Sequence, residues 1–65
     1  MDKAIIILGI QDNIKMDDYR SYVIRRNVTI KAIKTYSDRF EIITETETLI
    51  LPKIDGARLE IRYER

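Results

Sequence analysis

The chain has no cysteine, no histidine and no tryptophan among its 65 residues, and only two glycines and one proline. Without cysteine no disulfide can form, and without cysteine or histidine the usual zinc sites are excluded. The same absences remove the side chains that most often act as nucleophile or general base at neutral pH. No glycine-rich phosphate loop can be built from Gly9 and Gly56 alone. The composition therefore predicts a protein that is not an enzyme, with no cofactor, no metal and no small-molecule substrate.

A chain of 65 residues forms one small globular domain, residues 1–65, with a modest hydrophobic core. Domains of this size often gain stability from disulfides, metals or association with another chain. Because the first two are excluded here, self-association is expected to matter, most simply as a homodimer. The N-terminus lacks the pattern of a secretory signal, and no cysteine suggests secretion. A cytoplasmic protein with no membrane partner is expected.

The longest apolar run, Ala4–Ile10, is predicted to be the strand around which the fold is arranged. It is far shorter than the stretch of about 20 residues that a helix needs to span a bilayer. Its consecutive isoleucines favour a strand, because branching at Cβ suits a pleated sheet. Because no polar residue alternates with the apolar ones, the strand is predicted to be covered on both faces.

The segment Met16–Arg26 is the one stretch with helical spacing. Its apolar side chains would share one helix face, and Asn27 could adopt the left-handed conformation that ends a helix. These side chains are Met16, Tyr19, Tyr22 and Val23. The run Tyr22–Ile24 also fits a strand, so a short helix is the expectation and a strand is the alternative.

From Val28 onward, apolar and polar residues alternate, which predicts strands. A three-residue loop, Ser37–Arg39, would place Tyr36 opposite Phe40 and Ile33 opposite Ile43. Residues 40–51 fit either one long bent strand or two strands joined by a loop.

The single proline sets the register expected for the last hairpin. With Ile54–Gly56 as a three-residue loop, Leu51 faces Leu59, and Pro52 falls in a pair that needs no N–H. The predicted fold class is therefore mainly β or α+β, with five short strands, a C-terminal antiparallel meander and one short helix. A small, partly open β-barrel is the alternative.

The two faces of this meander are unequal. The inner face carries the expected core: Val28, Ile30, Ala32, Tyr36, Phe40, Ile42, Leu49, Leu51, Ala57, Leu59, Ile61 and Tyr63. The opposite face carries an aliphatic row with a charged border: Ile33, Ile43 and Ile50, with Lys31, Glu45 and Arg58 around them. Solvated isoleucines forgo about 1.5–3 kcal/mol each. The row is therefore predicted to be covered, either by another part of the chain or by a protein partner.

The charges suggest a second kind of partner. The net charge is only +1, but basic residues gather in the segment from residue 20 to residue 39. A nucleic-acid surface would use them with one aromatic side chain: Arg20, Arg25, Arg26, Lys31, Lys34, Arg39 and Tyr22. The leading hypothesis is a non-catalytic module that binds itself or another protein, in the second case as a regulator of a larger one. A small nucleic-acid-binding β-domain is the alternative.

Overall fold

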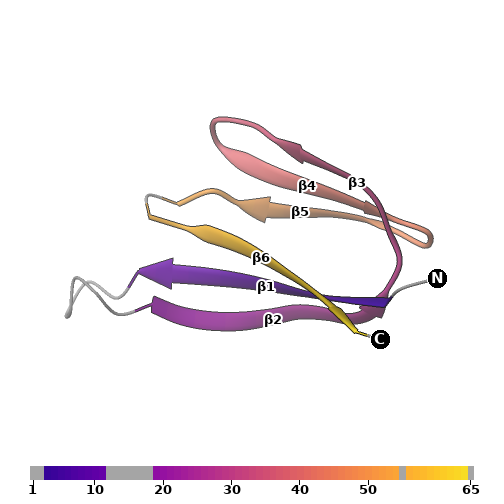
Figure 1. Cartoon of the computed structure of the whole chain (residues 1–65). Coiled ribbons are helices and arrows are strands. Elements are labelled where there is room, and N and C mark those ends of the chain that lie inside the picture. Colours follow the sequence, from indigo (N-terminus) through magenta and orange to yellow (C-terminus); the bar gives the residue numbers. More distant parts are fainter. Residues whose placement is uncertain (1–2, 12–18, 55, 65) are drawn as a thin grey trace.

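The computed structural model describes residues 3–11, 19–54 and 56–64 and shows an all-β chain in these ranges (Figure 1). The strands are β1 (Lys3–Gln11), β2 (Tyr19–Val28), β3 (Ile30–Thr35), β4 (Arg39–Thr44), β5 (Thr48–Pro52) and β6 (Arg58–Glu64). They form two three-stranded antiparallel sheets, sheet A in the order β2-β1-β6 and sheet B in the order β3-β4-β5. The prediction of a mainly β fold is confirmed. In the same ranges, no helix is long and apolar enough to cross a membrane.

Strand β1 is the centre of sheet A, as its unbroken apolar run predicted. One face of β1 turns Ile6 and Leu8 into the space between the sheets, where both are buried. On the other face, Ile7 is only 6% exposed. Its cross-strand neighbours there are Val23 on β2 and Glu60 on β6. The strand is thus buried on both faces, and the expectation is confirmed.

The core lies between the two sheets, which Figure 1 shows as two layers of strands. Ile6 of sheet A and Ile42 of sheet B are both 0% exposed. The other buried members of the cluster are Leu8, Phe40, Leu49 and Leu51. Strands β4 and β5 alternate buried and more exposed residues, as expected for strands with one face on the core. The core positions predicted for these two strands are therefore confirmed.

The predicted helix over Met16–Arg26 is wrong where it can be compared with the structure. Residues from Tyr19 onward form β2, and residues 16–18 lie outside the described ranges. β2 pairs with β1 along its length and carries extra residues at two register shifts. Asn27 has the left-handed conformation expected of it, with φ 59°, but at the second of these irregularities and not at a helix end. Pairing with the apolar β1 outweighs a weak helical pattern.

The chain passes from sheet A to sheet B at Thr29. This residue touches both layers: its hydroxyl accepts a hydrogen bond from Lys3 Nζ at 3.2 Å, and its carbonyl accepts one from Glu45 N–H at 3.1 Å. Bulges and bends are the usual devices by which a strand changes sheets. Because the predicted helix is the strand β2, the described residues form six strands and not five.

The predicted register of the β3–β4 hairpin is wrong by one residue. Ile33 faces Ile42 and Thr35 faces Phe40, and a register shift at Lys31 separates Ile30 from Ala32. The predicted loop lacked glycine at its last position, which such loops normally require. The hairpin instead closes through a hydrogen bond from Tyr36 N–H to the Arg39 carbonyl, at 2.9 Å. The Arg39 guanidinium lies 4.1 Å from the centre of the Tyr36 ring, a cation–π contact that favours this closure.

The slip changes which side chains belong to the core. Ala32 now pairs with Ile43 on the outer side of sheet B. Tyr36 is exposed beyond the end of β3, so the assignments of Ala32 and Tyr36 to the inner face are wrong. Tyr63 pairs with Ala4 on the inner side of sheet A but is 60% exposed, so it is not part of the core. Phe40 and Leu51 keep their predicted core positions, because neither depends on the register of β3.

The predicted pairing of Leu51 with Leu59 is also wrong. β5 belongs to sheet B and β6 to sheet A, where Leu59 pairs with Leu8. A turn closed by the bond from Ala57 N–H to the Ile54 carbonyl, at 2.8 Å, lies on the path between the sheets. Gly56 in this turn has φ 78°, a conformation that glycine adopts without strain. Asp55 lies outside the described residues.

The meander is therefore three-stranded and the molecule is not a closed barrel, since the two sheets share no hydrogen-bonded strand pair among the described residues. Residues 40–51 form two strands and not one. The turn between them is held by Thr44, whose hydroxyl donates to the Glu47 carbonyl at 2.8 Å and accepts from the Glu47 N–H at 3.0 Å.

Truncating two adjacent isoleucines tests this register. Ile42→Ala removes a fully buried side chain, so it should lower the free energy of unfolding by about 2–5 kcal/mol. Ile43→Ala changes a half-buried residue on the outer face and should cost about 1 kcal/mol, in the range of ordinary substitutions. Urea denaturation of both variants measures the difference. Equal losses, or a larger loss for Ile43→Ala, would contradict the assignment of faces.

Candidate functional site

Two members of the predicted aliphatic row come together on the outer face of sheet B. Ile43 on β4 pairs with Thr48, and Ile50 on β5 pairs with Glu41, so the two isoleucines are diagonal neighbours. Ile50 is 64% exposed and Ile43 is half-buried. Ile33 does not join them. It pairs with Ile42 and therefore lies on the opposite side of the sheet, where it is 42% exposed.

The predicted border residues are dispersed. Lys31 lies at the register shift of β3, Glu45 follows the end of β4, and both are exposed. Arg58 belongs to β6 in sheet A, so it does not border the outer face of sheet B. The mispredicted hairpins account for this result, because each border assignment followed from a register that the chain does not adopt.

The outer edge of β5 supplies main-chain groups beside Ile50. Two hydrogen bonds bracket β5: Thr44 N–H to the Glu47 carbonyl at 2.9 Å, and Lys53 N–H to the Asp38 carbonyl at 3.0 Å. Hydrogen-bonded and non-hydrogen-bonded pairs alternate along an antiparallel ladder. In the register of β4 and β5, Leu49 and Leu51 therefore bond to β4.

The intervening residues Thr48, Ile50 and Pro52 direct their main-chain groups away from β4. No strand pairs with this edge among the described residues. Pro52 has no N–H to offer, so the edge presents the N–H groups of Thr48 and Ile50 and the carbonyls of all three. We define the β4–β5 surface as Ile43, Thr48, Ile50 and Pro52. Thr48 and Pro52 were absent from the sequence-based site because strand order is needed to recognise a sheet edge.

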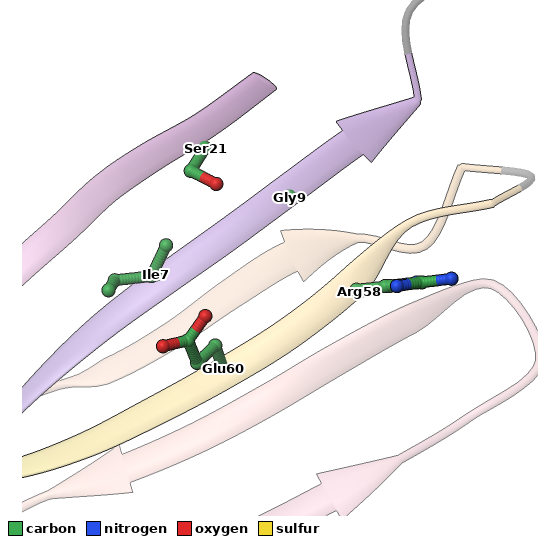
Figure 2. A pocket seen from close by; sticks show the side chains of 5 residues that line it. All are labelled: Ile7, Gly9, Ser21, Arg58 and Glu60. Carbon is green, nitrogen blue, oxygen red and sulfur yellow. The ribbon is translucent and has the colours of Figure 1, made fainter. Parts of the chain in front are cut away.

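A shallow hollow of about 150 Å³ lies on the outer face of sheet A (Figure 2). Gly9 forms part of it because it places no side chain between its cross-strand partners Ser21 and Arg58. Ile7 and Glu60 complete the lining. Glu60 also forms an ion pair with Arg62. Ser21 has no histidine to activate it as a nucleophile, since the chain has none.

The basic residues of the nucleic-acid alternative are divided between the sheets. Arg20, Arg25, Arg26 and Tyr22 lie on β2, whereas Lys31, Lys34 and Arg39 lie on β3 and β4. Arg25 forms an ion pair with Glu47 at 2.8 Å, and Arg39 forms ion pairs with Glu41 at 2.8 Å and Asp38 at 2.9 Å. The hydrogen bond to Glu41 raises the pKa of Arg39 above its ordinary value. Two of these cations are thus paired with carboxylates of the same chain.

The described part of the chain contains no group of three acidic side chains close enough to hold a metal ion. Comparison with known proteins gives no match to a family model, a curated protein or a solved structure. The geometry of the β4–β5 surface is therefore the basis on which a function can be assigned.

The division of the basic residues leads us to expect no salt-sensitive binding of a labelled single-stranded oligonucleotide at about 0.1 M salt, because phosphate binding needs several available cations. Fluorescence anisotropy at low and moderate salt measures this. Binding that weakens with salt and is lost in Arg25→Ala and Arg26→Ala, but retained in Arg62→Ala on sheet A, would support the nucleic-acid alternative.

Proposed function

We propose that this protein is a non-catalytic binding module that associates with itself or with another protein through the β4–β5 surface. The observation that carries the proposal is Ile50, which is 64% exposed beside the edge of β5 that pairs with no other described strand. An apolar side chain next to unpaired main-chain groups is the arrangement that partners use when they add a strand to a sheet.

The small size of the domain makes the burial of each exposed isoleucine important for its stability. Covering an isoleucine contributes about 1.5–3 kcal/mol, whereas the core of so short a chain supplies only about 3–5 kcal/mol of net stability. Covering Ile50 and the adjacent Ile43 would therefore be a substantial gain. This gain supports an interface on the outer face of sheet B.

The other three sheet edges carry features that discourage strand addition. β2 and β3 contain register shifts and several basic residues, and β6 alternates charged side chains along its length. Bulges and edge charges are the common protections against edge pairing. β5 reads Thr-Leu-Ile-Leu-Pro and carries no charge, with Pro52 at its end. This contrast favours β5 as the edge that accepts a partner.

No specific observation favours the nucleic-acid alternative over this proposal. The absence of histidine and cysteine supports a non-catalytic role. A cytoplasmic location is part of the proposal and is supported by the lack of cysteine.

Lysine substitutions on the two sides of sheet B test the proposed surface. Ile50→Lys should weaken association at least tenfold, because it places an ammonium group in the apolar contact at the β5 edge. Ile43→Lys, on β4 and one strand further from that edge, should weaken association by a smaller factor. Both variants should stay folded, since neither position belongs to the buried core. Ile33→Lys, at an exposed isoleucine on the other side of the sheet, should associate like the parent chain.

Two assays read out these variants, with thermal melting as the check of folding. Sedimentation equilibrium measures self-association. Immobilised parent and variants, exposed to host extract and compared by quantitative mass spectrometry, measure retention of other proteins. The proposal is contradicted if Ile50→Lys self-associates and retains proteins as the parent does, or if the parent does neither.

A further inference from the structure

We infer that the partner is a second copy of this chain, which pairs its β5 antiparallel with the first β5 about a two-fold axis at Ile50. The inference rests on the proposed function and specifies its partner and contact. It would join two copies of sheet B into one continuous sheet. Closed two-fold dimers are the commonest protein oligomers, and in them each copy uses the same surface.

The main chain of β5 suits this arrangement. The N–H and carbonyl of Ile50 face the open edge, so the two copies of Ile50 can exchange both hydrogen bonds. In the same register, Thr48 lies opposite Pro52 of the other copy. Each Thr48 N–H can then donate to a Pro52 carbonyl. The missing N–H of proline costs one bond at each end of the short ladder, where water can reach the remaining carbonyl.

The charges flanking β5 select this register. When Ile50 lies opposite Ile50, Glu47 of each copy lies opposite Lys53 of the other copy. The two-fold axis therefore creates two such pairs. Glu47 uses Oε1 in its ion pair with Arg25, and the ammonium of Lys53 lies 5.4 Å from the centre of the Phe40 ring. Opposite charges directly across an antiparallel pair are stabilising, whereas like charges are destabilising.

Other pairings of the same edges lose this match. An antiparallel register centred on Leu49 would place Glu47 opposite Leu51. A parallel arrangement in register would place Glu47 opposite Glu47 and Lys53 opposite Lys53. The Ile50-centred register also brings the two exposed Ile50 side chains together on the outer face, beside the half-buried Ile43. Charge and apolar contact therefore favour the same axis.

A proline substitution tests the hydrogen bonding directly. Ile50→Pro removes an N–H that faces the open edge and leaves the bonds between β5 and β4 intact, so the variant should fold as a monomer. Leu49→Pro, at the neighbouring position, removes an N–H that bonds to β4 and should unfold the domain. Short edge contacts bury less than about 1,200 Å² and form weak complexes, so sedimentation equilibrium should span micromolar to millimolar protein. The parent should dimerise in this range.

Charge reversal gives a second test that does not depend on how the chain tolerates proline. Glu47→Lys and Lys53→Glu should each raise the dissociation constant at least fivefold, because each places like charges across the axis. The double variant, Glu47→Lys with Lys53→Glu, should restore most of the parent affinity. A dimer that persists in Ile50→Pro, or that ignores the sign of these charges, overturns the inference. A parent that stays monomeric also overturns it, while retention of another protein that depends on Ile50 would still uphold the proposed function.

Discussion

The fold depends on burial of the apolar strand β1. Its isoleucines need cover on both faces, and β2 and β6 supply hydrogen-bonding partners on either side. Sheet B then closes over Ile6 and Leu8 with Phe40, Ile42, Leu49 and Leu51. The need to bury β1 explains why residues 19–28 form a strand. It also explains why β6 pairs with β1 and not with β5. Because both layers are only three strands wide, each sheet ends in two edges, and the domain must protect or use all of them.

Local sequence pattern was sufficient wherever the order of apolar and polar residues along a strand decides which of its faces are buried. The unbroken run in β1 and the alternation in β4 and β5 identified the strands and most of the core. The pattern failed where tertiary pairing decides the outcome. Tyr22–Ile24 satisfied both a helical and an extended period, and only the presence of β1 beside it selects the strand. In the same way, Leu59 could match Leu51 or Leu8, and the choice depends on the sheet that β6 joins.

In the candidate site, too, local pattern predicted some residues correctly and tertiary pairing decided the others. Ile43 and Ile50 were identified correctly as residues on the face opposite the core, because alternation along β4 and β5 is enough to place them. Ile33 was assigned to the wrong face, since a slip of one residue reverses every side chain of a strand. Thr48 and Pro52 could not be recognised as an edge until the strand order was known. One residue of the sequence does indicate the edge: the single proline, Pro52, lies where β5 needs no N–H for pairing with β4.

Hydrogen exchange of the β5 amides tests the central claim, that this edge is open in the single chain and closes on association. In dilute solution, the amides of Leu49 and Leu51 should be protected and those of Thr48 and Ile50 should exchange fast. At high protein concentration, the Thr48 and Ile50 amides should become protected as well. Protection of Thr48 and Ile50 that does not depend on concentration would contradict the open edge. Fast exchange at these two amides in a solution shown to contain dimer would contradict its closure by a second β5.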